Sequence, residues 1–147
     1  MKRILAIDYG SKRTGIAVTD TEQIIASGLT TIETQQIFKF LTDYFTKEKV
    51  ECLVVGDPKN LNNSPAESAY ATYEFIKKLK NKYPEMPIYM VDERFTSKMA
   101  FQAMIAGGVK KMDRRNKATI DMVSAAIILQ SFMEMKKEGR LPPNISL

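Results

Sequence analysis

Two apolar, strand-like runs that each follow a helix-length segment restrict the fold of this chain more than any other feature. The runs are ECLVVG at 51–56 and MPIYMVDE at 86–93. Residues 34–47 precede the first run and residues 65–82 precede the second, and both segments carry apolar side chains at helical spacing. Strands joined through a helical crossover run parallel in one sheet. The pattern therefore predicts an α/β fold with a partly parallel sheet.

The N-terminal part of the chain predicts three more strands. RILAIDYG at 3–10 and TGIAVTD at 14–20 are apolar, partly β-branched runs separated by a short turn, which is typical of a hairpin. QIIASGLTTIE at 23–33 has the character of a third strand. With the two later runs, we expect a five-stranded mixed sheet flanked by helices.

Helical segments also predominate towards the C-terminus. Thr96 or Ser97 is placed to cap a short helix that ends near residue 106, and a long helix is expected over 118–137. The element order is then βββαβαβαα, without a linker that would divide it. At 147 residues the chain has the size of one domain. We expect that domain over residues 1–138 and a tail over 139–147.

Cysteine and histidine usage excludes several chemistries. The chain has no histidine and one cysteine, Cys52. The sequence therefore lacks the residues needed for three kinds of site, which are a structural zinc site, a histidine-based triad and an internal disulfide. Acid–base and metal chemistry must come from carboxylates, whose hard oxygen atoms match Mg²⁺ or Mn²⁺.

The start of the chain predicts a cytoplasmic location. The basic residues of MKR are followed by a short apolar block from Ile4 to Ile7 before Asp8. Such a block is too short for a secretory signal or a membrane span.

Positive charge is concentrated in one segment, KKMDRRNK at 110–117. Five basic residues against one acid leave this segment with a net charge of +4, compared with +5 for the whole chain. The basic residues are Lys110, Lys111, Arg114, Arg115 and Lys117, and the acid is Asp113. Clustered basic charge favours a polyanionic partner, because phosphates release counterions when they meet it. A solvated surface loop is an equally good interpretation of the charge run alone.

Acidic residues stand where three predicted strands end. Asp8 ends the first strand, Asp57 follows Gly56 at the end of the fourth, and Asp92 with Glu93 ends the fifth. The carboxyl ends of parallel strands share one edge, where open α/β sheets bind ligands. Like charges gathered there disturb each other unless a cation lies among them, so the pattern indicates a metal site. The alternative for each acid alone is an ordinary turn residue.

Asp121 adds a fifth candidate. It lies in ATIDMVSAAIILQSFM, a helix that is apolar nearly all round and therefore expected to be buried. An ionised carboxylate that faces a core is costly unless it is paired or bound to metal. The alternative is a first-turn position after a Thr119 cap, where the helix dipole stabilises an acid by about 0.3–1 kcal/mol.

Residues beside the acids have two interpretations each. Asp92 and Glu93 cannot both face one site, because side chains alternate along a strand. Arg94 is suited to hold a phosphate bidentately or to pair with Asp92. Lys12 and Arg13 follow Asp8 in the turn, where they are placed to meet a nucleic-acid backbone or to remain solvated at a hairpin tip.

The segments AIDYGSKRTGIAVTD, VVGDPKN, VDERFTS and ATIDMVSAAIIL, in this order, resemble the YqgF family over nearly the whole chain. That family comprises bacterial proteins of ribonuclease H-like fold, described as Holliday junction resolvases and as nucleases that process the 5′ end of pre-16S ribosomal RNA. The resemblance implies a ribonuclease H-like fold and a nuclease. It implies Asp8, Glu93 and Asp121 as catalytic carboxylates and so prefers Glu93 over Asp92. Asp57 departs from the family pattern, so it is a possible additional metal ligand or a loop residue.

The resulting hypothesis is a metal-dependent endonuclease that hydrolyses phosphodiester bonds in precursor rRNA or branched DNA. We expect two Mg²⁺ or Mn²⁺ ions about 3.5–4 Å apart between the carboxylates. The basic residues would grip backbone phosphates without reading bases. The protein would act as a monomer or a homodimer, since resolving a junction takes two cuts. The alternatives are a non-catalytic nucleic-acid-binding factor that retains the fold and an actin-like phosphotransferase, which needs a second lobe.

Overall fold

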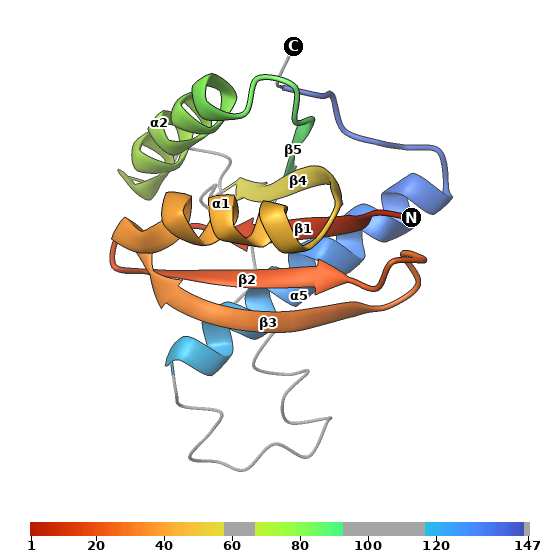
Figure 1. Cartoon of the computed structure of the whole chain (residues 1–147), viewed down its shortest axis with the longest axis horizontal. Helices are drawn as coiled ribbons and strands as arrows, with labels where there is room; N and C mark the ends of the chain where they lie inside the picture. The colour runs from red at the N-terminus through yellow and green to blue at the C-terminus, as the bar shows by residue number, and fades with distance from the viewer. Residues whose placement is uncertain (58–66, 93–116, 146–147) are drawn as a thin grey trace.

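The computed structural model describes residues 1–57, 67–92 and 117–145 (Figure 1). Within them a five-stranded sheet has the strand order β3-β2-β1-β4-β5. Strands β1, β2 and β3 pair antiparallel, whereas β1, β4 and β5 pair parallel. Helices α1 and α2 cover one face of the sheet and α5 covers the other. The mixed sheet flanked by helices is confirmed.

The bounds of the elements follow the sequence pattern closely. The strands are β1 (Arg3–Asp8), β2 (Arg13–Thr19), β3 (Ala26–Glu33), β4 (Val50–Asp57) and β5 (Ile88–Asp92). The helices are the 3-10 turn η1 (Thr34–Gln36), α1 (Ile37–Lys47), α2 (Glu67–Lys82) and α5 (Lys117–Lys137). The third strand begins at Ala26 and not at Gln23, because Gln23 adopts a positive φ of 58° in the turn that precedes it. The short helix expected to end near residue 106 lies outside the described residues.

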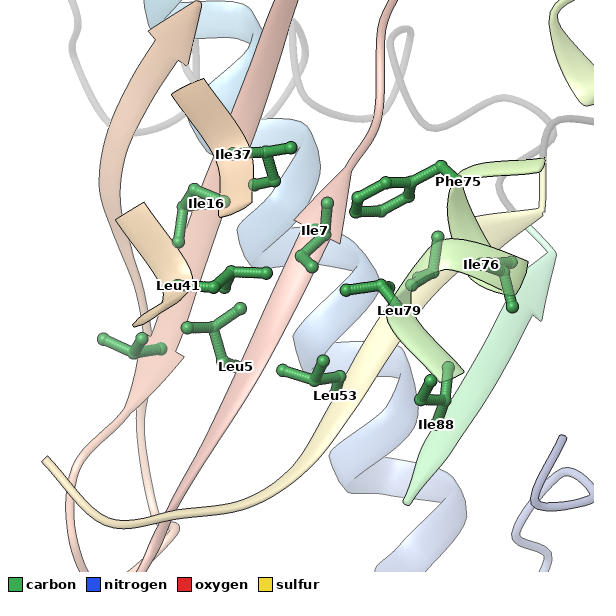
Figure 2. Close-up of a cluster of buried hydrophobic side chains, with 12 residues drawn as sticks. Leu5, Ile7, Ile16, Ile37, Leu41, Leu53, Phe75, Ile76, Leu79 and Ile88 are labelled. Carbon is green, nitrogen blue, oxygen red and sulfur yellow. The ribbon is translucent and has the colours of Figure 1, made fainter. Parts of the chain in front are cut away.

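One core lies between the sheet and helices α1 and α2 (Figure 2). Alternate residues of the strands face it, because side chains of a strand point in turn to opposite faces. On the helices the buried residues recur at helical spacing. The core includes Leu5, Ile7, Ile16, Leu53 and Ile88 from the strands and Ile37, Leu41, Phe75, Ile76 and Leu79 from the helices.

The second core lies between the opposite face of the sheet and α5. It contains Ile4, Ala6, Ala17, Cys52, Val54 and Val91 from the strands, and Ala125, Ile128, Leu129 and Phe132 from α5. By length and composition alone, residues Ala118–Lys137 could cross a membrane. Their packing against the sheet accounts for the same composition, because the central helix of a globular core is equally apolar.

The segment after α5, predicted as a tail, returns to the sheet. The backbone N–H of Ile145 donates a hydrogen bond of 2.8 Å to the carbonyl of Ile88, and Tyr89 forms a β-bridge with Asn144. Strand β5 is at the edge of the sheet, so these bonds satisfy part of its exposed backbone.

Cys52 lies in the core beneath α5 and is 3% exposed. Burial, followed by the neighbouring Glu51 charge, raises the pKa of its thiol to about 12. We therefore expect thiol reagents at pH 8 to modify the native protein at least about a hundredfold more slowly than the chain in guanidinium, because the thiolate is the reactive form. The measurement is unambiguous, since the chain contains one cysteine. Rapid labelling under native conditions would contradict this packing.

Candidate active site

Asp8 ends β1 on the side of the sheet that α5 covers. Ile4 and Ala6 face the α5 core and Leu5 and Ile7 face the opposite core. The alternation continues to Asp8, whose side chain therefore belongs to the α5 side. Asp8 is partly buried, and its neighbour across the antiparallel pairing is Gly15 of β2.

Asp121 reaches the same place from α5. A Cβ atom added to Gly15 would collide with the backbone carbonyl of Asp121, so the helix and β2 are in direct backbone contact at this point. Since Gly15 is also the cross-strand partner of Asp8, the two carboxylate residues lie beside each other. Residues far apart in the chain thus meet at one edge of the sheet.

The position of Asp121 within α5 removes the alternative of a capped first turn. The helix already begins at Lys117, so Thr119 lies within it and Asp121 is its fifth residue. The alternative in which Thr119 caps the helix is therefore wrong, and the helix dipole at a first-turn position does not account for Asp121. Its side chain is 25% exposed and reaches Arg13 at the start of β2.

Two contacts fix the beginning of α5 over the strands. The hydroxyl of Thr31 in β3 donates a hydrogen bond of 2.5 Å to the carbonyl of Ala118. Gly28 of β3 lies under Met122, close enough that an added Cβ would be 2.6 Å from Met122 Cγ. Gly28 and Gly15 therefore let this part of α5 approach the sheet closely.

Arg13 forms an ion pair with Asp121. Its Nε atom lies 3.0 Å from Oδ2 of the carboxylate, and the arginine side chain is 41% exposed. Arg13, Lys12, Ser11, Gly10 and Asp121 line a hollow of about 300 Å³, which we call the Asp121 hollow. The turn after Asp8 thus contributes cationic side chains directly beside the carboxylate of Asp121.

The turn between β1 and β2 is held by a residue that the sequence reasoning did not select. Thr34 donates a side-chain hydrogen bond of 2.6 Å to the carbonyl of Gly10 and a backbone bond of 3.0 Å to that of Lys12. Its hydroxyl also lies 2.9 Å from the hydroxyl of buried Thr14. In the sequence Thr34 looks like an ordinary residue at the start of a helix. Its role could not be predicted from local patterns, because Gly10 and Lys12 precede it by more than 20 positions.

Asp57 faces the opposite side of the sheet. Leu53 and Val55 face the α2 core, and the alternation places Asp57 with them. The hydroxyl of Tyr73 in α2 donates a hydrogen bond of 2.9 Å to Asp57 Oδ1. Burial, followed by this bond to Asp57, raises the pKa of Tyr73, so the phenol remains protonated and acts as the donor.

Asp92 has the same orientation as Asp57. The two residues are direct partners in the parallel pairing of β4 and β5. Val91 packs into the α5 core and Ile88 into the other, so alternation assigns Asp92 to the α2 side. Asp57 and Asp92 are therefore separated from Asp8 and Asp121 by the sheet.

The other predicted site residues lie outside the part of the chain that the structure describes. They are Glu93, Arg94, Lys110, Lys111, Arg114 and Arg115. Among the described residues, no group of three or more Cys, Asp or Glu side chains is close enough to hold a metal ion. Asp8 and Asp121 nevertheless fit Mg²⁺ or Mn²⁺ in chemistry, because they offer carboxylate oxygens and one of them already attracts a cation, the Arg13 guanidinium.

Known proteins resemble this chain over nearly all of its length. The model of the RuvX family, described as Holliday junction resolvase, matches residues 2–135. A protein of Flavobacterium psychrophilum, named "Putative pre-16S rRNA nuclease", is 58% identical over 92% of this chain and 99% of its own length. Proteins with the same name from Christiangramia forsetii and Phocaeicola vulgatus are 57% and 56% identical, over 90% and 93% of this chain and 98% and 99% of their own lengths.

The fold has counterparts among solved structures. RuvC of Thermus thermophilus, in complex with a Holliday junction substrate, superposes with a TM-score of 0.62 at 16% identity, over 97% of this chain and 99% of that chain. A second structure of Thermus thermophilus RuvC has a TM-score of 0.59 at 14% identity, over 96% and 99%. The predicted ribonuclease H-like fold is thereby confirmed. Together with the sequence matches, it shows that this chain belongs to the RuvX family, also called YqgF.

Proposed function

We propose that this protein is a metal-dependent endonuclease that hydrolyses phosphodiester bonds in structured nucleic acid. Its substrate would be the 5′ end of precursor 16S rRNA, a Holliday junction, or both. The names of its relatives support the substrate class. The observation that carries the proposal is the meeting of Asp8 and Asp121 at one edge of the sheet, through their common neighbour Gly15.

We assign Asp8, Glu93 and Asp121 as the catalytic carboxylates and the ligands of Mg²⁺ or Mn²⁺. Of the two neighbouring acids at the end of β5, Asp92 belongs to the α2 side of the sheet, which leaves Glu93 as the candidate for this site. Bound divalent ions would polarise the scissile phosphate and lower the pKa of an attacking water. The carboxylates would bind and orient these ions, and any side-chain acid–base chemistry would also fall to carboxylates, since the chain has no histidine.

Arg13 pairs with Asp121, and Lys12 lines the same hollow. In the structure Arg13 holds the Asp121 carboxylate from the side of the Asp121 hollow. We propose that Arg13 orients this carboxylate and, with Lys12, meets a phosphate of the substrate. Arg94 would add a bidentate phosphate contact. These contacts use backbone phosphates, so the shape of the nucleic acid would select the cleavage position.

The test is cleavage by the purified full-length protein of two labelled substrates, a precursor 16S rRNA fragment and a four-way DNA junction. Each is incubated with Mg²⁺, with Mn²⁺ and with EDTA. We expect cleavage of at least one substrate with either metal ion and none with EDTA. Binding of both substrates without cleavage under any of these conditions would overturn the nuclease proposal in favour of a non-catalytic binding factor. Paired, symmetric cuts in the junction would in addition indicate a dimer.

The basic segment yields a separate prediction. Replacing Lys110, Lys111, Arg114 and Arg115 with glutamine should weaken nucleic-acid binding at moderate salt by about tenfold or more, because four phosphate contacts are lost. The slope of log affinity against log salt should fall by roughly three for a single strand. Fluorescence anisotropy over a salt series measures both quantities. A variant whose affinity and slope equal those of the wild type would show that this segment does not contact phosphates.

A further inference from the structure

A groove of about 600 Å³ lies between α1, α2 and the turn that follows β1. Its lining includes the rings of Tyr9, Phe38 and Phe75 and the polar side chains of Ser11, Gln35 and Lys78. We call it the aromatic groove. Its volume is in the range of pockets that hold small ligands, about 300–1,000 Å³.

The three rings form a stacking platform. Tyr9 lies parallel to Phe75, with 4.3 Å between ring centroids and an interplanar angle of 12°. Phe38 lies against the same Phe75 ring at 5.6 Å in a tilted arrangement. Phe75 is 2% exposed whereas Tyr9 and Phe38 are only partly buried, so the aromatic surface open to a ligand belongs to these two residues. A planar ring placed on Tyr9 would extend an existing stack.

The polar side chains around the rings suit a nucleotide. Gln35 offers an amide and Ser11 a hydroxyl, and both are exposed. Lys78 adds a positive charge, and Lys82 Nζ lies 5.4 Å from the centre of the Phe38 ring. One acid, Glu74, also lines the groove, but it is paired with Lys77 at 3.2 Å, so the charge around the rings is positive in balance. Aromatic faces combined with amide, hydroxyl and ammonium groups are how proteins hold unpaired bases with their phosphates.

The aromatic groove lies next to the candidate active site. Tyr9 directly follows Asp8, and Ser11 lines both the groove and the Asp121 hollow. The turn that separates the two is held in place by the bonds from Thr34. The groove is on the α2 side of the sheet and the carboxylates are on the α5 side, so a strand that contacts both would cross the sheet edge at this turn.

We propose that the aromatic groove binds one unpaired nucleotide of a single-stranded segment next to the scissile phosphate. Its base would stack on Tyr9 and Phe38, and Lys78 would contact a backbone phosphate. This inference rests on the proposed function in one respect, which is that the scissile phosphate lies at the carboxylates next to the groove. It adds a substrate class, because a fully paired junction offers no unpaired base to this groove.

The test measures binding in EDTA, where no metal-dependent cleavage occurs, by fluorescence anisotropy of the full-length protein. The probes are a single-stranded RNA, a DNA of the same sequence, and a fully paired four-way junction. Tyr9→Leu should weaken single-strand binding at least about fivefold, through the loss of base stacking. Lys78→Gln should lower the slope of log affinity against log salt by about 0.7 for a single strand. Neither variant should change junction affinity by more than about twofold.

Matched controls separate the groove from general charge and from folding. Lys47→Gln removes the same charge at the far end of α1 and should leave single-strand binding unchanged. Lys78 is exposed, so we expect Lys78→Gln to retain the fold. Thermal melting shows whether Tyr9→Leu loosens the core. Direct contact is tested in the wild type with 5-iodouridine in the RNA, which should crosslink on irradiation to Tyr9 or Phe38.

Crosslinks to other residues alone, or variants that weaken single-strand and junction binding equally, would overturn the proposal. Wild-type affinity of both variants would overturn it as well. Comparing the RNA and DNA strands shows whether the groove prefers a ribonucleotide. Equal affinity supports contacts to the base and phosphate alone. Tighter binding of RNA supports an added contact from Ser11 or Gln35 to the 2′-hydroxyl. Absence of cleavage in the nuclease test would not alter these results, so the two proposals fail independently.

Discussion

Asp8→Asn is expected to reduce metal-dependent cleavage by on the order of a thousandfold while leaving nucleic-acid binding within about twofold of the wild type. The substitution retains the size of the side chain but removes the charge that a divalent ion requires. Asp8 lies beside Asp121 on the α5 side of the sheet and is not one of the basic residues predicted to contact phosphates. Cleavage rates at saturating substrate, compared with anisotropy in EDTA, separate the two effects.

Asp57→Asn is the matched control for that experiment. It makes the same isosteric change at the end of the neighbouring strand, but on the side where Tyr73 donates to the carboxylate. We expect it to retain cleavage and to lose a few tenths to about 1.5 kcal/mol of stability, as for a weakened hydrogen bond. Full activity of Asp8→Asn would remove the proposed catalytic role. A loss in Asp57→Asn as large as in Asp8→Asn would instead add Asp57 to the metal site.

Gly15→Ala is expected to destabilise the fold and to reduce cleavage together. The added Cβ would collide with the backbone carbonyl of Asp121, and backbone cannot rotate away as a side chain can. Overpacking of this kind costs about 1–3 kcal/mol, which corresponds to a decrease in Tm of roughly 3–10 °C for a chain of this length. Displacing α5 would also move Asp121 away from Asp8, and a shift of about 1 Å at a catalytic group can cost on the order of a hundredfold in rate.

Gly28→Ala is the control for the packing argument. Its added Cβ would meet chiefly the Met122 side chain, whose Cγ is 2.6 Å away and able to move. We expect a smaller loss of Tm, and the double variant with Met122→Ala should recover part of it. Thermal denaturation followed by circular dichroism measures all of these variants. Wild-type Tm and activity in Gly15→Ala would show that α5 does not lie against β2 as the structure has it.

Within the described residues, the sequence was sufficient for the order of the elements and for the parallel arrangement of β1, β4 and β5. Continuous apolar runs and helical periodicity are local properties, so their interpretation did not depend on distant residues. The same reasoning located acids at three strand ends and singled out Asp121, because a charge in an apolar helix is informative by itself. The ribonuclease H-like fold and the family followed from the motifs around these residues.

The resemblance implied that Asp8 and Asp121 act together, but only the tertiary structure showed on which side of the sheet each acid lies. The strand ends converge on one edge of the sheet. The face on which an end residue lies depends on which alternate residues of that strand point to the α1/α2 core and which point to the α5 core. That alternation assigns Asp8 to α5 and assigns Asp57 and Asp92 to α2. Arg13 pairing with Asp121, Thr34 holding the turn after β1 and Tyr9 stacking on Phe75 each join residues more than 20 positions apart. Periodicity in a sequence reports how a segment is buried, whereas contacts of this kind depend on how α1, α2 and α5 are placed across the sheet.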